Sequence, residues 1–150
     1  MMRYYDTGVL LKLYTEEPES KKVRTYVVGQ GDPLPFHAFH HSECTSAFHL
    51  KAFRRECTVA QANRALEDLQ EDLRHGVLRR VRPDWDEVWD RCRELSLAHA
   101  AETGCRTLDT LHVACALELG YRDFVTTDKR QSALADRIGL RVCDPTRETT

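Results

Sequence analysis

Residues 1–17, MMRYYDTGVLLKLYTEE, join a short apolar strand pattern to the start of an apolar helix pattern. Asp6 stands inside this segment, between Tyr5 and an apolar run that ends at Leu13. A carboxylate costs several kcal/mol to bury unless another group pairs with it. The segment therefore predicts that Asp6 faces a partner that compensates its charge.

The length and composition of the chain are those of one ordinary globular domain. A chain of 150 residues can bury about two-thirds of its unfolded surface around a single core. We expect one domain over residues 1–145 and a flexible tail over residues 146–150. The net charge of −2 gives no overall basic footprint for nucleic acid, so a nucleic-acid partner has to be bound by local charges.

The location expected from the sequence is the cytoplasm. No apolar stretch approaches the roughly 20 residues that a membrane span needs. Asp6, Lys12 and the TEEPESKK run interrupt any apolar signal-peptide core near the N-terminus. We therefore expect no membrane partner.

The six cysteines form no C-x-x-C pair, and several fall at apolar or helix-patterned positions. Since the cytosol keeps thiols reduced, the pattern favours buried thiols over disulfides or a zinc site.

Short apolar strand patterns alternate with longer helical patterns, which predicts an α/β domain with a central, mostly parallel sheet of about five strands flanked by helices. Strand patterns cover 3–6, 33–36, 76–81, 123–127 and 140–143. One helical pattern ends at Tyr14, and another begins at Asp84. Further helical patterns cover 18–28, 40–54, 59–75, 107–119 and 130–138. Trp85 and Trp89 share one helix face, which indicates core packing or a dimer face.

Acidic side chains gather at one edge of this predicted sheet. Asp6 and Asp128 each follow a strand, and ligands of parallel sheets bind beyond the carboxyl ends of the strands. Glu43 stands early in one helix, and Asp109 opens a very apolar one. Each acid alone could be a helix cap or a favourable charge at a helix N-terminus, but this does not explain four acids at the same end of neighbouring elements.

The sequence resembles the PIN-domain nucleases, in particular the short VapC-type toxins of bacterial toxin–antitoxin pairs. The resemblance rests on the order and spacing of four segments: YYDTGVLLKLYTEEPES (4–20), SECTSAFHLKAFRRE (42–56), RTLDTLHVACALELG (106–120) and FVTTDKRQSALADRIGLRV (124–142). It places the acidic quartet of the family, both catalytic and metal-binding, on Asp6, Glu43, Asp109 and Asp128. Thr126 matches a hydroxyl position that supports the site.

Four close carboxylates repel one another unless a cation neutralises them, and Mg²⁺ or Mn²⁺ suits an all-oxygen site that also binds a phosphodiester. We expect Asp6 and Asp109 to bind such an ion directly. Glu43 and Asp128 then orient the attacking water or complete a second metal site. The resemblance implies an endoribonuclease that leaves 5′-phosphate and 3′-hydroxyl ends, a cognate VapB-like antitoxin, and a homodimer.

One position departs from the family pattern. Gly8 stands where many relatives carry a serine, so a hydroxyl near Asp6 is missing, and Thr7 is the candidate to replace it.

Basic and histidine side chains near the quartet are weaker candidates. An acidic nuclease centre needs cations on its rim to hold phosphates. The cations that flank the quartet in the sequence are Lys12, Lys51, Arg106, Lys129 and Arg130. For His37, His40 and His41 the context favours surface or capping roles over zinc. His112, three residues after Asp109, is either a core residue or a support for the site.

Two alternatives to the nuclease stay open. Haloacid-dehalogenase-like phosphotransferases also place an Asp after the first strand, but they need a second Asp where this chain has Gly8. A non-catalytic interaction module of the PIN fold is the stronger alternative, although all four acids are retained. By the resemblance, the antitoxin groove falls on apolar residues of the early helices: Val9, Leu13, Tyr14 and Phe48.

Overall fold

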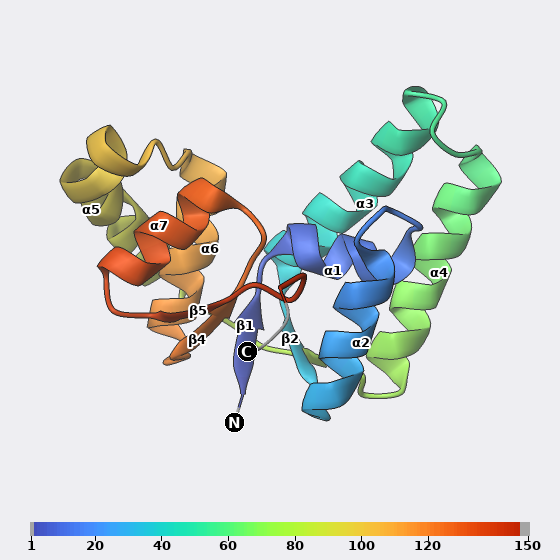
Figure 1. Cartoon of the computed structure of the whole chain (residues 1–150), viewed down its shortest axis with the longest axis horizontal. Helices are drawn as coiled ribbons and strands as arrows, with labels where there is room; N and C mark the ends of the chain where they lie inside the picture. Colours follow the sequence, from blue (N-terminus) through green and yellow to red (C-terminus); the bar gives the residue numbers. More distant parts are fainter. Residues whose placement is uncertain (1, 148–150) are drawn as a thin grey trace.

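The computed structural model describes residues 2–147. Most of the predicted tail, residues 148–150, lies outside the described residues, and the domain boundary at residue 145 stays a prediction. The elements, labelled as in Figure 1, are β1 Arg3–Tyr5, α1 Thr7–Tyr14, α2 Ser20–Gln30, β2 Leu34–Phe36, α3 Ala38–Phe53, α4 Val59–Arg74, β3 Leu78–Arg80, α5 Trp85–Thr103, α6 Thr107–Glu118, β4 Asp123–Val125, α7 Lys129–Arg137 and β5 Arg141–Cys143.

The predicted α/β architecture with parallel strands is confirmed. Strands β1, β4 and β5 form one parallel sheet in the order β1-β4-β5, with Tyr4 opposite Phe124 and Phe124 opposite Val142. Strands β2 and β3 form a second parallel pair, with Leu34 opposite Leu78. Figure 1 shows β1 and β2 side by side between a group of helices α1–α4 and a group of helices α5–α7.

The single five-stranded sheet is corrected to three strands plus two, because β1 and β2 lie in contact without a hydrogen-bond ladder. Pro35, in the middle of β2, has no N–H to donate. The carbonyl of Tyr5 instead accepts a hydrogen bond from the His40 ring at 2.8 Å. A side chain therefore satisfies the edge of β1 where a neighbouring strand was expected.

The core has two parts, one on each face of the sheet. Tyr4 and Phe124 lie in the cluster under α5–α7, whereas Tyr5 and Val125 lie in the cluster under α1–α4. This follows from the period of a strand, in which successive side chains point to opposite faces. Both faces of β1 and β4 are covered, and Asp6 follows the carboxyl end of β1.

Two local features agree with the sequence patterns, and one prediction stays open. Thr58 and Gln61 form a capping box at the start of α4. Four of the six cysteine thiols are buried and two are half-buried, and all are free. Of the two tryptophans predicted to lie in the core or on a dimer face, Trp85 packs against the buried His37 ring. Trp89 is 49% exposed and outside the core, so the dimer face stays a prediction for it. Among the helices described, none has the length and apolarity that a membrane span requires.

Candidate functional site

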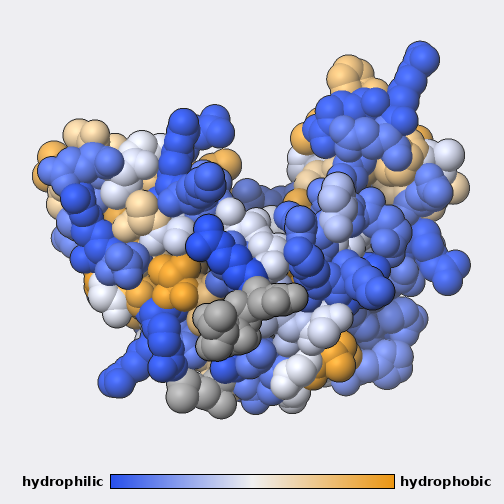
Figure 2. Space-filling model, in the orientation of Figure 1, coloured by the Kyte–Doolittle hydropathy of each residue, from blue (hydrophilic) through white to orange (hydrophobic). Residues whose placement is uncertain are grey.

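The four predicted acids line one hollow of about 410 Å³. Asp6 precedes α1, Glu43 lies in α3, Asp109 lies in the first turn of α6, and Asp128 precedes α7. The hollow thus collects side chains from both groups of helices, at the carboxyl ends of β1 and β4. Figure 2 shows a saddle between the two raised ends of the molecule.

Asp6 is the most deeply buried of the four acids. One carboxylate oxygen caps α1 by accepting the Val9 N–H at 2.9 Å, and the other accepts the Thr126 hydroxyl at 2.8 Å. Burial raises the pKa of Asp6, while the bonds from Thr126 and Val9 oppose this shift. These donors compensate only part of the cost of burying the charge, so the pocket would favour a cation beside Asp6.

Asp109 and Asp128 line the hollow from the starts of the adjacent helices α6 and α7. Burial raises the pKa of Asp109, and the negative charge of Asp128 adds to the shift. Asp128 caps α7 by accepting the Gln131 N–H at 2.8 Å. The completely buried amide of Gln131 donates to the Asp109 carbonyl at 3.0 Å and lies 2.7 Å from the Thr126 hydroxyl. Gln131 thus ties the Asp109 and Asp128 helices to Thr126.

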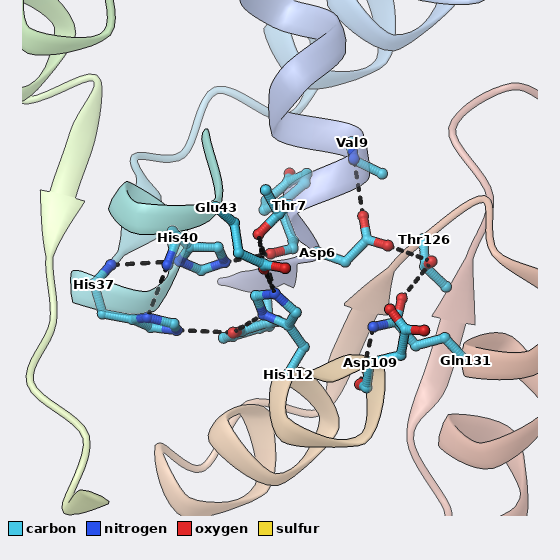
Figure 3. Close-up of polar contacts among 12 residues, drawn as sticks. Asp6, Thr7, Val9, His37, His40, Glu43, Asp109, His112, Thr126 and Gln131 are labelled. Atoms are coloured by element: carbon cyan, nitrogen blue, oxygen red, sulfur yellow. Dashed lines mark hydrogen bonds and ion pairs between the residues drawn. The ribbon is translucent and has the colours of Figure 1, made fainter. Parts of the chain in front are cut away.

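Glu43 reaches the hollow from α3 and is held by two side chains. Its Oε1 atom accepts the Thr7 hydroxyl at 2.7 Å and lies 2.5 Å from Nε2 of His112 (Figure 3). The Thr7 hydroxyl is also 3.0 Å from the same His112 nitrogen. Thr7 therefore lies at the site but contacts Glu43, not Asp6.

Buried, hydrogen-bonded aromatic side chains connect His112 to the start of α3. The Tyr4 hydroxyl lies 2.7 Å from His112 Nδ1 and 2.8 Å from His37 Nε2. His37 and His40 form the capping box of α3, which confirms the capping role for both, and both rings are buried. Burial lowers the pKa of His37 to about 3 and that of His40 well below its usual value.

The predicted rim cations differ in their surroundings. Lys12 and Arg106 lie near enough to Asp6 and Asp109, respectively, to lower the pKa of each acid. Lys51 instead pairs with Glu17 and Glu56, at 3.4 and 3.6 Å, around a different hollow. Two further rim candidates lie on the first turn of α7, where both are exposed: Lys129 and Arg130.

The groove residues inferred from the resemblance need correction. Val9 and Phe48 are completely buried in the core under α1–α4, so they are inaccessible to a partner. Leu13 and Tyr14 are half-buried. At Gly8, a Cβ atom would lie 3.6 Å from both Asp6 carboxylate oxygens, an ordinary contact, so space alone does not demand glycine there.

Sequence reasoning missed three residues that support the site: Tyr4, His37 and Gln131. Gln131 carried a readable signal, since Asp128 and Gln131 have the D-x-x-Q spacing of a capping box. Its side chain, however, turns towards Asp109 and Thr126. Tyr4 and His37 carried no local signal, because their contacts join distant parts of the chain.

The chemistry of the hollow fits a divalent metal ion. Four carboxylates line it, and the one imidazole that also lines it, His112, already contacts Glu43 and Tyr4 with its two nitrogens. Burial together with the charge of Asp128 keeps the pKa of Asp109 raised. An all-oxygen donor set with uncompensated negative charge suits Mg²⁺ or Mn²⁺. Asp6 and Asp109, whose pKa values burial raises, are the two that would hold such an ion, and Glu43 and Asp128 line the same hollow.

Comparison with known proteins defines the family. A sequence model of the PIN domain matches residues 3–137, so the chain belongs to the PIN domain family. The fold is similar to the crystal structure of FitAcB from Neisseria gonorrhoeae, with a TM-score of 0.63 and 18% sequence identity over 96% of this chain and 98% of that chain. A search of curated proteins found no match.

Removal of the Thr126 hydroxyl tests how far this hydrogen bond stabilises the ionised form of Asp6. In Thr126→Val the carboxylate loses a donor that lowers the pKa of Asp6, so this pKa should rise further and leave less carboxylate at neutral pH. We expect Mn²⁺ affinity to fall about 10-fold, the lower end of the effect of losing an outer hydrogen bond at a metal site, and the pH at half-binding to rise. Mn²⁺ titrations between pH 5 and 8 would measure both.

Thr126→Ser is the matched control, because it keeps the hydroxyl and removes only a methyl group. Equal Mn²⁺ affinities in Thr126→Val and Thr126→Ser would contradict the role of this hydrogen bond.

Proposed function

We propose that this chain is a metal-dependent endoribonuclease of the VapC type, which hydrolyses RNA phosphodiester bonds at Asp6, Glu43, Asp109 and Asp128. The observation that carries the proposal is the shared hollow: four acids from four separate elements line it. Membership of the PIN domain family supports nuclease chemistry there. We place the activity in the cytoplasm.

The residues divide into two roles. Asp6 and Asp109 hold Mg²⁺ or Mn²⁺, because burial raises the pKa of both and a bound cation favours their ionised forms. When bound, the ion stabilises negative charge on the phosphate and makes water a better nucleophile at neutral pH. Glu43, fixed by Thr7 and His112, orients the attacking water, and Asp128 completes the acidic wall.

RNA phosphates need positive charge around an acidic hollow. Lys12 and Arg106 are the best placed of the rim candidates, since each already acts on an acid of the quartet. The exposed pair Lys129 and Arg130 extends this rim along α7. Lys51 is the weakest candidate, because two glutamates bind it elsewhere.

A VapB-like antitoxin and a homodimer complete the proposal, on the strength of the sequence resemblance. Two half-buried side chains, Leu13 and Tyr14, remain from the inferred antitoxin groove. The alternative, a non-catalytic interaction module, would keep this fold without cleavage.

Metal dependence provides the test. Purified chain is incubated with a structured RNA pool in Mg²⁺ or Mn²⁺, and in parallel with excess EDTA, and the new RNA ends are mapped. We expect cleavage with the metal, at least about 100-fold slower cleavage in EDTA because the carboxylates lose the ion that compensates them, and 5′-phosphate ends. Absence of both cleavage and Mn²⁺ binding by calorimetry would favour the interaction module.

A further inference from the structure

Tyr4 of β1 connects the helix cap at His37 to the acidic hollow. Its ring is completely buried and stacks on Phe124, with ring centroids 5.5 Å apart. Its hydroxyl lies between two ring nitrogens, Nε2 of His37 at 2.8 Å and Nδ1 of His112 at 2.7 Å. The Tyr4 hydroxyl has one proton, so it can donate to only one of its neighbours, which also include the Cys115 thiol.

The direction of these bonds follows from groups that can only donate or only accept. The backbone N–H of His37 points at Nδ1 of His40 at 3.4 Å, and the backbone N–H of His40 points at Nδ1 of His37 at 3.5 Å. Both Nδ1 atoms are therefore acceptors, and each neutral ring carries its proton on Nε2. For His40 this agrees with its other bond, because Nε2 faces the Tyr5 carbonyl at 2.8 Å, which can only accept.

The same direction continues to the acidic hollow. Nε2–H of His37 donates to the Tyr4 oxygen. At the other end, the Glu43 carboxylate can only accept, so a neutral His112 ring carries its proton on Nε2, which lies 2.5 Å from Glu43. Nδ1 of His112 is then free to accept the Tyr4 hydroxyl. Along this series of hydrogen bonds, from the helix cap at His37 to the Glu43 carboxylate, every donor therefore faces an acceptor.

The same histidines could suggest a metal site, because one ligand atom from each of three buried rings lies within 4.8 Å of the others: His37, His40 and His112. The hydrogen bonds argue against it. Both nitrogens of His37 and of His40 already have partners, including two backbone N–H groups and a backbone carbonyl. A metal ion would leave those backbone groups buried without partners.

We propose that Tyr4 is a positioning residue of the acidic site: its hydroxyl fixes the orientation and tautomer of the His112 ring, and through it the position of Glu43. The catalytic part of this inference rests on the proposed nuclease function, whereas the tautomer of His112 does not. Tyr4 itself touches neither the hollow nor its acids in the described residues.

The tautomers can be read from the ¹⁵N ring signals of the full chain without metal or RNA. We expect His37, His40 and His112 all to carry the proton on Nε2. In Tyr4→Phe, which keeps the stacked ring, the Nδ1 signal of His112 should move downfield because it loses its donor, while the His40 pattern is kept. Comparison with a His112→Gln spectrum assigns the signals.

Tyr121→Phe is the matched control. Tyr121 lies beside Tyr4, with ring centroids 6.0 Å apart, but its hydroxyl contacts Arg79 instead of a histidine. His37→Asn is a second variant, because asparagine keeps the helix cap while it removes the donor to Tyr4, together with the ring contacts to Phe39 and Trp85. We expect it to shift the same His112 signal less than Tyr4→Phe does.

Activity gives the functional readout. We expect Tyr4→Phe to lower kcat about 10-fold, as losses in the outer hydrogen bonds of metal sites do, with an unchanged KM for RNA. Tyr121→Phe should leave both constants unchanged. Mn²⁺ affinity of the same variants provides a readout apart from cleavage.

The inference is overturned if His112 carries its proton on Nδ1, or if Tyr4→Phe and Tyr121→Phe shift its signals equally. Equal kcat in these two variants would overturn the positioning role. If the wild-type chain neither cleaves RNA nor binds Mn²⁺, the proposed function fails, and the ¹⁵N comparison still decides whether Tyr4 sets the tautomer of His112.

Discussion

Asp6→Asn is expected to reduce metal-dependent RNA cleavage by at least about 10²–10³-fold, the loss that follows removal of one preorganised group from a charged reaction centre. Asparagine has the shape of aspartate and is an equally good helix cap, so the bond from the Val9 N–H can be kept. The substitution therefore removes the charge of Asp6 and leaves its place in the fold intact.

The same variant should not lose stability. Because burial raises the pKa of Asp6, the folded chain holds this proton more tightly than the unfolded chain does. The ionised form at neutral pH therefore opposes folding, and a neutral asparagine does not. We expect the Tm of metal-free Asp6→Asn at pH 7 to equal or exceed that of the wild type.

The effect of Mn²⁺ on stability distinguishes the loss of a metal ligand from a general folding defect. Mn²⁺ at 100 times its Kd should add about 2.7 kcal/mol to the free energy of unfolding of the wild type and so raise its Tm. The same concentration should have little effect on the Tm of Asp6→Asn. Asp68→Asn is the matched control, because Asp68 is exposed on α4 and pairs only with Arg64 nearby. Wild-type cleavage by Asp6→Asn would exclude Asp6 as a metal ligand.

Phe124→Ala is expected to destabilise the fold by about 3–5 kcal/mol. Phe124 is completely buried at the centre of β4, between β1 and β5, and its ring stacks on Tyr4. The substitution removes the apolar contacts of the ring and leaves a cavity that short, covered strands cannot collapse to fill. Since the free energy of unfolding of a domain is only about 5–15 kcal/mol, this substitution would remove a large part of it.

Denaturant titration of Phe124→Ala beside Phe53→Ala measures this effect. Phe53 ends α3 and is 83% exposed, so the same substitution there should change stability by less than about 0.5 kcal/mol. A loss at Phe53 as large as that at Phe124 would show that the two-sided core is wrongly placed.

Local signals in the sequence were sufficient to predict where most helices and strands lie. The capping box of Thr58 and Gln61 and the helical stripe that follows it act within a few residues, so they are readable without tertiary contacts. The four acids were also placed correctly at one edge of the sheet, because parallel strands bring their carboxyl ends together. Their chemical assignment depended on the order and spacing of four long segments.

The resemblance named Thr126 as a support of the site, but only the tertiary structure decided which acid each supporting residue contacts. The Tyr4 contact with His112 spans 108 residues, and the Thr126 contact with Asp6 spans 120. No periodicity or cap in the sequence encodes such a pair, because it depends on how the elements pack. The missing ladder between β1 and β2 and the exposure of Trp89 have the same cause.

The sequence by itself therefore determined the alternation of strands and helices and the position of the acids at the strand ends, because strand period, helix caps and strand order act along the chain. The burial of His40, the hydrogen bonds of Glu43 and the link through Tyr4 were decided by packing. Packing alone decides which donors and acceptors, far apart in the chain, are brought within bonding distance in a dry interior.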